Sequence, residues 1–314
     1  MMSNDEVMQK FEDDALLHDL RERTVETYRR CFGMLLEFSK ETEYAALTAA
    51  HLRDWLLFLK KKTKLSGATI NQYNSSCKFF LKVVLEEEVD DTQVPNSKIR
   101  RKPQPFMTVD EIIQFFAGFT DIVAFTYYLL LYSTGLRKSE ALCITMEDIH
   151  GDDKHPNDDY IFIRNGKGGK QRNVSLPHVT YLMLREYYRV FWGPVVRNMT
   201  EEEKEGIKTM PLFPAKINGI KATSFFSKAF NSIRDGNTLF KKFHPHTLRH
   251  SYAVHTLQKD NNKILKVKAQ LGHTHLSSTE IYLGDARLYD VENPRDPEEV
   301  AGILCRAFHA RTGA

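Results

Sequence analysis

The amino-acid sequence predicts a mainly helical protein of the α+β class, in which an all-helical N-terminal domain precedes a mostly helical domain with a small antiparallel sheet. Three observations support this prediction. Apolar residues recur at helical spacing through residues 24–88. A segment with three prolines, residues 95–105, then interrupts the pattern. Farther along, residues 160–176 read as two short strands around a glycine-rich turn.

The composition is that of an ordinary globular protein. The chain has 314 residues, of which 42% are hydrophobic and 27% are charged, and this length indicates about two domains. No apolar run approaches the roughly 18 residues that a membrane helix needs. Residues 1–10 are polar and lack the apolar core of a signal peptide. We therefore expect a cytoplasmic protein without a membrane partner.

The net charge and the cysteine content exclude few of the functions that this chain could have. The net charge of +3 is mildly basic and does not by itself establish a nucleic-acid partner. Basic runs at residues 60–64 and 98–102 contrast with an acidic N-terminus, although solvated faces explain such runs equally well. The four cysteines are widely spaced and form no Cys-x-x-Cys pair, which favours reduced packing residues over a metal or redox site.

The N-terminal domain is predicted to span residues 1–94, with helix starts at Thr24, Thr48 and Ser66. The polar face of its last helix includes Asn74 and Lys78, which are candidates for contacting a DNA groove. An ordinary solvent-exposed face accounts for these side chains equally well.

Residues 95–106 are predicted to be an extended, positively charged linker to a second domain of residues 107–314. An extended basic segment is suited to lie along phosphates, because its cations can neutralise the backbone charge. The candidate phosphate contacts in this linker are Arg100, Arg101 and Lys102.

The second domain opens with a capping box that begins at Thr108, and a nearly continuous apolar helix follows at residues 122–132. Gly135 permits a tight turn after this helix and places Arg137 at the start of the next one. Glu140 lies three residues on and can hold the guanidinium by charge-assisted hydrogen bonds. The arginine can equally belong to a structural salt bridge.

The predicted hairpin pairs residues 160–163 with residues 172–176 and carries Lys167 near its tip. Its Gly-Lys-Gly sequence lacks the spacing of a phosphate-binding P-loop, and taken alone it is typical of a surface turn. Lys170 and Arg172 follow on the same hairpin and are candidates for DNA contact.

The densest group of chemically versatile side chains lies between residues 243 and 282. Pro245 is compatible with a helix start, and the three-residue spacing of His246 and Arg249 places both on one face. A second helix is predicted to begin at residues 277–280 and to carry Tyr282. A phenol, imidazoles and a guanidinium together suit attack of a tyrosine on a phosphodiester, because its transition state gains negative charge.

Zinc binding is an alternative use of these histidines. His246 and His250 have the spacing of metal ligands on a helix, and His273 and His275 can complete a set of four. An all-histidine structural site is uncommon, and no cysteine or carboxylate occupies a position suited to a ligand.

Five short sequences together resemble the tyrosine site-specific recombinases, the phage integrases and Xer-type enzymes, over residues 24–282. They are Thr134-Gly-Leu-Arg-Lys-Ser-Glu140, Gly166-Lys-Gly168, His246-Thr-Leu-Arg-His250, Leu271-Gly-His273 and Tyr282, in the order of that family. The resemblance implies that Tyr282 is the nucleophile and that Arg137 and Arg249 bind the scissile phosphate. It further implies hydrogen bonding and proton transfer by His246 and His273, and protonation of the leaving oxygen by Lys167.

The resemblance also implies a SAM-like core-binding domain and a catalytic domain that form a C-shaped clamp around DNA. The expected activity is site-specific recombination through a 3′-phosphotyrosyl intermediate and a Holliday junction, without a metal ion, ATP or another cofactor. A DNA-binding protein without strand exchange and a type IB topoisomerase-like enzyme are the alternatives. The expected partner is double-stranded DNA with a specific recombination site, in the nucleoid of a bacterial or archaeal cell.

A C-terminal helix at about residues 297–309 carries one apolar stripe. By resemblance, we expect it to dock on a neighbouring copy in a homotetramer on paired sites, with an accessory protein as a further possible partner. Packing against its own domain is the alternative.

Overall fold

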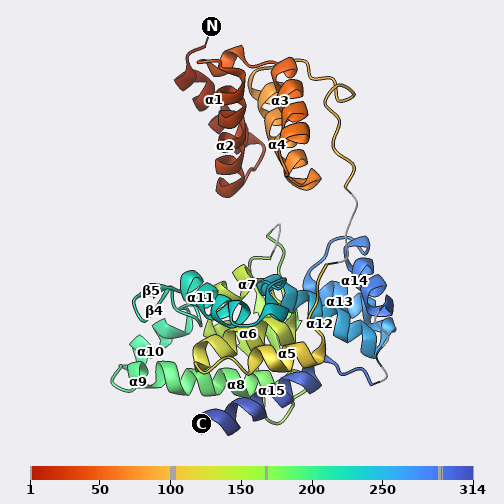
Figure 1. Cartoon of the computed structure of the whole chain (residues 1–314). Helices are drawn as coiled ribbons and strands as arrows, with labels where there is room; N and C mark the ends of the chain where they lie inside the picture. Colours follow the sequence, from red (N-terminus) through yellow and green to blue (C-terminus); the bar gives the residue numbers. More distant parts are fainter. Residues whose placement is uncertain (1, 100–103, 167–168, 289–290, 292, 314) are drawn as a thin grey trace. The chain divides into compact units, whose positions relative to one another are not determined.

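The computed structural model describes residues 2–99, 104–166, 169–288, 291 and 293–313. The chain forms two compact units, Met1–Lys102 and Pro103–Ala314 (Figure 1). Each unit has a hydrophobic core of its own.

In its described residues the first unit contains four α-helices: α1 (Asn4–Leu17), α2 (Glu22–Ser39), α3 (Ala49–Lys62) and α4 (Gly67–Phe79), which continues as a π-helical turn at Phe80–Val84. Aromatic side chains from three of these segments meet in its core. The ring of Phe32 stacks on that of Phe80 at 4.2 Å between centroids, and Phe11 packs edge-on against Phe32 at 4.9 Å. Burial of these rings holds the helices together.

Helix α1 was not predicted, because the acidic character of this segment hides its three buried residues, Val7, Phe11 and Ala15. Helix α2 begins at Glu22, two residues before the predicted start. The predicted caps at Thr48 and Ser66 are confirmed, since each hydroxyl accepts a hydrogen bond from a backbone N–H in the first turn.

The prediction that Asn74 lines a DNA groove is wrong. Its side chain is buried, and its amide donates hydrogen bonds to the Val94 carbonyl and to Asn96 Oδ1, both at 3.0 Å. The amide therefore ties α4 to the segment that follows it. Lys78 is partly exposed and its ammonium lies 2.7 Å from the carboxylate of Asp91, so its predicted DNA contact would compete with this ion pair.

The second unit begins with α5 (Val109–Phe116), α6 (Ile122–Thr134) and α7 (Lys138–Cys143), and α8 (His178–Tyr187) follows a small sheet. Helix α6 is buried over nearly its whole length, as its continuous apolar sequence predicts. Around it, the later helices are α9 (Gly193–Val196), α10 (Glu201–Lys208), α11 (Ala222–Asp235), α12 (Pro245–Lys259), α13 (Ile264–Leu271), α14 (Ser277–Leu288) and α15 (Pro297–Thr312).

The sheet has three antiparallel strands, β1 (Ile149–His150), β2 (Tyr160–Ile163) and β3 (Arg172–Ser175). The pairing of Ile161 with Val174 places both side chains in the core. A separate two-stranded ribbon joins β4 (Lys216–Ile217) to β5 (Ile220–Lys221). The predicted hairpin and the predicted fold class, mainly helical with a small antiparallel sheet, are confirmed.

The C-terminal helix packs on its own unit. Helix α15 contacts α5, α6, α8 and α12 of its own unit, and Figure 1 shows it alongside α8. Its Phe308 ring stacks on Phe125 at 4.1 Å, and His309 Nε2 lies 2.6 Å from a Glu186 oxygen. The structure shows the alternative arrangement, in which α6 and α8 of the same unit cover the apolar stripe, and docking on another copy stays a prediction.

None of the helices in the described part of the chain is long and apolar enough to cross a membrane.

Candidate active site

The first arginine of the site is positioned by the turn between α6 and α7. Gly135 has a φ of +67°, and a Cβ atom there would lie 2.6 Å from Cδ1 of Tyr252, so glycine is required. The chain then reverses, and Arg137 becomes the N-cap of α7. The turn and the following helix start were both predicted from the sequence.

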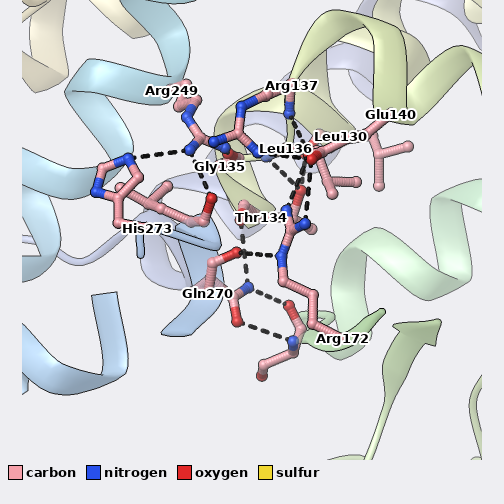
Figure 2. Close-up of polar contacts among 12 residues, drawn as sticks. Leu130, Thr134, Gly135, Leu136, Arg137, Glu140, Arg172, Arg249, Gln270 and His273 are labelled. Atoms are coloured by element: carbon pink, nitrogen blue, oxygen red, sulfur yellow. Dashed lines mark hydrogen bonds and ion pairs between the residues drawn. The ribbon is translucent and has the colours of Figure 1, made fainter. Parts of the chain in front are cut away.

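Glu140 holds this arginine and a second one. Its carboxylate accepts hydrogen bonds from Arg137 Nη1 at 2.7 Å and from Arg172 Nη2 at 2.9 Å (Figure 2). Burial alone would raise the pKa of Glu140, but the hydrogen bonds and charges of the two arginines outweigh it and lower the pKa to about 2. Glu140 is therefore a fixed anion that orients both guanidinium groups.

The structure changes the role predicted for Arg172. Its side chain is only 13% exposed and lies against Glu140, and its Nε donates to the Gln270 carbonyl at 3.2 Å. The Arg172 guanidinium is paired with Glu140 inside the protein, so its predicted DNA contact would compete with this ion pair. The position of Arg172 on a predicted strand gave no indication that its guanidinium would bind Glu140 and the Gln270 carbonyl.

Gln270 was not singled out from the sequence, yet it joins three segments of the site. Its side-chain amide donates to the Thr134 carbonyl at 3.2 Å and to the Ser175 carbonyl at 2.8 Å, and its oxygen accepts from the Ser175 N–H at 2.9 Å (Figure 2). The side chain thereby links the end of α6, β3 and α13. A glutamine within an otherwise apolar helical stripe is the sequence signal that could have identified it.

Arg249 lies on α12 and is 6% exposed. It donates to the Gly135 carbonyl at 2.6 Å and to the Leu271 carbonyl at 2.7 Å, and its Nη2 lies 3.3 Å from His273 Nε2. Burial and the nearby charge of Arg137 lower the pKa of Arg249 to about 10, so it remains protonated at neutral pH. Figure 2 shows the two guanidinium groups next to one another.

Tyr282 is brought to Arg249 and His273 by α14, which begins at Ser277 as predicted. The phenol ring stacks on His273 with 5.9 Å between centroids, and His273 Nδ1 lies 3.0 Å from the hydroxyl of Thr279. Burial raises the pKa of Tyr282, whereas the charges of Arg249 and Arg137 and a hydrogen bond with Arg249 lower it. The phenol thus lies beside two cations that favour its ionised form.

The other predicted residues have different positions. His246 is exposed at the start of α12, where partial burial of its ring and the charges of His244 and Arg249 lower its pKa. Lys170 is exposed on the hairpin. Lys167, Arg100, Arg101 and Lys102 lie outside the described residues.

The four histidines proposed as zinc ligands do not form a metal site. Among the described residues, no group of three or more histidine, cysteine, aspartate or glutamate side chains could hold a metal ion. His250 pairs instead with Asp285, with its Nε2 3.0 Å from the carboxylate. His273 is oriented by Arg249 and Thr279.

Comparisons with known proteins cover both units. The family model "Phage integrase family" matches residues 106–287, and "Phage integrase, N-terminal SAM-like domain" matches residues 7–91. A tyrosine recombinase of Thermosipho africanus is 29% identical over 297 residues, which cover 89% of this chain and 95% of the relative. The tyrosine recombinase XerD of Oceanobacillus iheyensis is 25% identical over 296 residues, with coverages of 88% and 93%.

Among the solved structures that share the fold are two recombinases bound to DNA sites. A lambda integrase dimer bound to a core site has a TM-score of 0.66 at 14% identity and covers 94% of this chain and 99% of its own. XerH recombinase in a post-cleavage complex with a palindromic difH substrate has a TM-score of 0.63 at 19% identity, with coverages of 92% and 83%.

Proposed function

The chain belongs to the phage integrase family of tyrosine recombinases, which break and rejoin DNA, and from this premise we propose that Tyr282 is its nucleophile. In this proposal the protein cuts each strand through a 3′-phosphotyrosyl intermediate. It then exchanges strands between two sites through a Holliday junction, so that a DNA element is integrated, excised or resolved. Double-stranded DNA with a specific recombination site is the substrate, as it is for the XerH and lambda integrase complexes.

The observation that carries this proposal is the charge balance around Tyr282. Three guanidinium groups, those of Arg137, Arg172 and Arg249, lie in one network, and Glu140 pairs with the first two. The partners of Arg249 described above are carbonyls, an imidazole and the phenol, and no carboxylate among the described residues forms an ion pair with it. An excess of buried positive charge beside a phenol favours binding of an anion, and a phosphodiester supplies one.

The DNA and the protein side chains account for every bond and proton in the proposed cleavage step. The Tyr282 oxygen attacks phosphorus, the bond to the 5′ oxygen breaks, and a 3′-phosphotyrosine forms. An acid protonates the 5′ oxygen as it leaves, and an imidazole of the site accepts the phenol proton. Ionising an unperturbed phenol of pKa about 10 costs roughly 4 kcal/mol at pH 7. Burial raises the pKa of Tyr282 above that value, and the charges of Arg249 and Arg137 offset part of this increase.

The proton-transfer roles are assigned by residue type and position. His246 has a lowered pKa and is therefore neutral at pH 7, which suits it to accept a proton. His273 lies between Arg249 and the Tyr282 ring and is suited to hydrogen-bond the phosphate. We assign protonation of the leaving oxygen to Lys167, with Lys170 as the competing candidate on the same hairpin.

The phosphotyrosine retains the free energy of the broken diester, so rejoining needs no ATP. Arginine and lysine supply the charge neutralisation that metal ions supply in many nucleases. We therefore propose a reaction without a metal ion or other cofactor. Exchange between two duplexes requires four cuts, and we propose that four copies assemble on paired sites.

A suicide-substrate assay tests the nucleophile. Nicked duplexes that carry candidate sites from the flanks of the gene are incubated with protein in EDTA, and covalent species are separated on a denaturing gel. We expect an adduct with the wild-type protein and with the matched control Tyr181→Phe on α8. Tyr282→Phe should bind the same DNA without forming an adduct.

The possible results separate the alternatives. An adduct in Tyr282→Phe would move the nucleophile elsewhere. Relaxation of supercoiled DNA without exchange between two sites would favour the topoisomerase-like activity. Specific binding without an adduct from any nicked substrate that is bound would favour a DNA-binding protein without strand exchange.

A further inference from the structure

The helix that carries Tyr282 packs on its unit through both apolar and polar side chains. Ala286 lies in a small apolar cluster with Tyr252 of α12, and Tyr282 and Leu283 pack against that cluster. Within residues 277–287 of α14, the buried side chains are those of Thr279, Asp285 and Ala286. Two of these three are polar. Apolar packing is non-directional, so the polar contacts of α14 have a large share in setting its position.

Asp285 makes one of these polar contacts. Its carboxylate oxygen Oδ2 lies 3.0 Å from Nε2 of His250 on α12, and the two side chains are 7% and 6% exposed. A buried carboxylate is costly unless it is hydrogen-bonded, so breaking this pair leaves Asp285 in an unfavourable environment. The pair therefore favours one position of α14 on α12.

His250 also touches the nucleophile itself. Its ring lies edge-on to the Tyr282 ring, with 4.9 Å between centroids and an interplanar angle of 67°. Because His250 follows Arg249 directly on α12, the residue that supports the phenol ring is fixed to the same turn as the arginine beside that phenol. A shift of His250 would move the phenol relative to the guanidinium.

Two polar side-chain contacts of α14, which we call its polar ties, lie before and after Tyr282 along the helix. Thr279, three residues before it, contacts His273 Nδ1 at 3.0 Å, and Asp285, three residues after it, contacts His250. Residues three apart share one helix face, so Tyr282 lies between both ties on the face that meets α12 and α13. This spacing restricts both the rotation and the translation of the helix.

We propose that Asp285 and His250 are positioning residues for strand cleavage, which hold the helix of Tyr282 so that its phenol faces Arg249 and the scissile phosphate. This inference rests on the proposed function and extends it to two residues that act through the nucleophile. Such positioning raises the cleavage rate, because small misplacement of a nucleophile lowers reaction rates strongly. It leaves DNA affinity unchanged, because neither side chain is exposed to bind DNA.

Single-turnover kinetics on the nicked substrate test this proposal. The rate of adduct formation is measured at saturating protein, and the dissociation constant of the same DNA is measured separately. We expect Asp285→Ala and His250→Ala each to slow adduct formation by about tenfold or more, with unchanged DNA affinity. Asp285→Asn retains an oxygen acceptor and should recover much of the rate.

The double variant shows whether the two residues act as a pair. Asp285→Ala combined with His250→Ala should be no slower than the slower single variant, because both changes remove the same contact. Glu280→Ala is the matched control, since Glu280 is exposed on the same helix. Single variants at the wild-type rate, or independent effects that multiply in the double variant, would overturn the proposal.

Hydrogen exchange provides a readout that does not depend on activity. In Asp285→Ala we expect faster exchange of the α14 amides, with α13 and α15 unchanged, whereas Asp285→Asn should exchange close to the wild-type protein. Faster exchange throughout the second unit would instead assign the pair to general stability and overturn the positioning role. If the wild-type protein forms no adduct, the proposed function fails, whereas this exchange pattern still tests the pair.

Discussion

The two halves of the candidate active site are held in different ways. Arg137, Arg172 and Arg249 are fixed by Glu140, by backbone carbonyls and by the Gln270 bridge, in a network that joins α6, α7, β3, α12 and α13. Tyr282 is carried by α14, which packs on a small apolar cluster through Leu283 and Ala286 and makes polar contacts through Thr279 and Asp285. The site therefore combines a cationic half fixed by a network of hydrogen bonds with a nucleophile positioned by helix packing and two polar contacts.

This difference has a physical consequence for the order of events. A preorganised set of cations stabilises the developing negative charge without rearranging during the reaction. A helix whose position depends on two polar contacts can shift when one of them is lost. In this protein, control of cleavage is thus expected to act through α14 and not through the arginines.

The largest expected effect concerns Arg249. Arg249→Gln removes a charged donor beside the phenol, and adduct formation at saturating protein should fall by about a hundredfold to a thousandfold. Single-turnover gels on the nicked substrate measure the rate, and Arg185→Gln on α8, which pairs with exposed Asp153, is the matched control. If the rate of adduct formation fell by less than about tenfold, Arg249 would contribute no more than one ordinary hydrogen bond. The proposed difference between the arginines and the Tyr282 helix would then be contradicted.

The next effect concerns the pH dependence of stability through Glu140. Its pKa of about 2 in the folded protein lies below its ordinary value of 4.5. Its contribution to the free energy of unfolding is therefore present above pH 4.5 and is lost as the pH falls towards 2. The difference amounts to about 3 kcal/mol, and it should be absent in Glu140→Gln.

Denaturant titrations between pH 2 and pH 6 measure this contribution. The chain has two tryptophans, and Trp192 lies in the second unit. In a Trp55→Phe background, its fluorescence reports unfolding of that unit alone. A constant difference in unfolding free energy between wild type and Glu140→Gln across this range would contradict the prediction.

The smallest expected effect concerns Thr279 on α14, the helix that carries the nucleophile. Thr279→Ala removes the hydroxyl that contacts His273 Nδ1, and adduct formation should slow by about tenfold while global stability changes by about 1 kcal/mol. Thr279→Ser keeps the hydroxyl and should remain near the wild-type rate. An equal loss in both variants would assign the effect to the methyl group and not to the hydrogen bond.

Much of the fold was predictable because local signals determine it. The Thr48, Ser66 and Thr108 caps, the turn at Gly135 and the start of α12 at Pro245 are each encoded within a few residues. Helix α1 was missed because its charged residues conceal a short apolar stripe. The environment of Asn74 was predicted wrongly because burial of a polar side chain depends on a distant partner, the carbonyl of Val94.

In the candidate site, too, contacts between residues close along the chain were predictable, and contacts between distant residues were not. Short motifs identified the residue types suited to phosphodiester chemistry, and Glu140 could be assigned to Arg137 because the two are three residues apart. The role of Arg172 was out of reach, since its partners Glu140 and Gln270 lie 32 and 98 residues away along the chain. Asp285 stands one turn after Tyr282, but its histidine partner lies on another helix.

The sequence by itself determined several of the helices, the hairpin and the set of side chains that could attack and neutralise a phosphate. These features follow from spacing along the chain, which sets helix faces, caps and turns. Only the tertiary structure decided which cations are buried, which carboxylate holds them, what supports the phenol and where α15 packs. These properties depend on burial and on contacts between distant segments, and no local pattern specifies them.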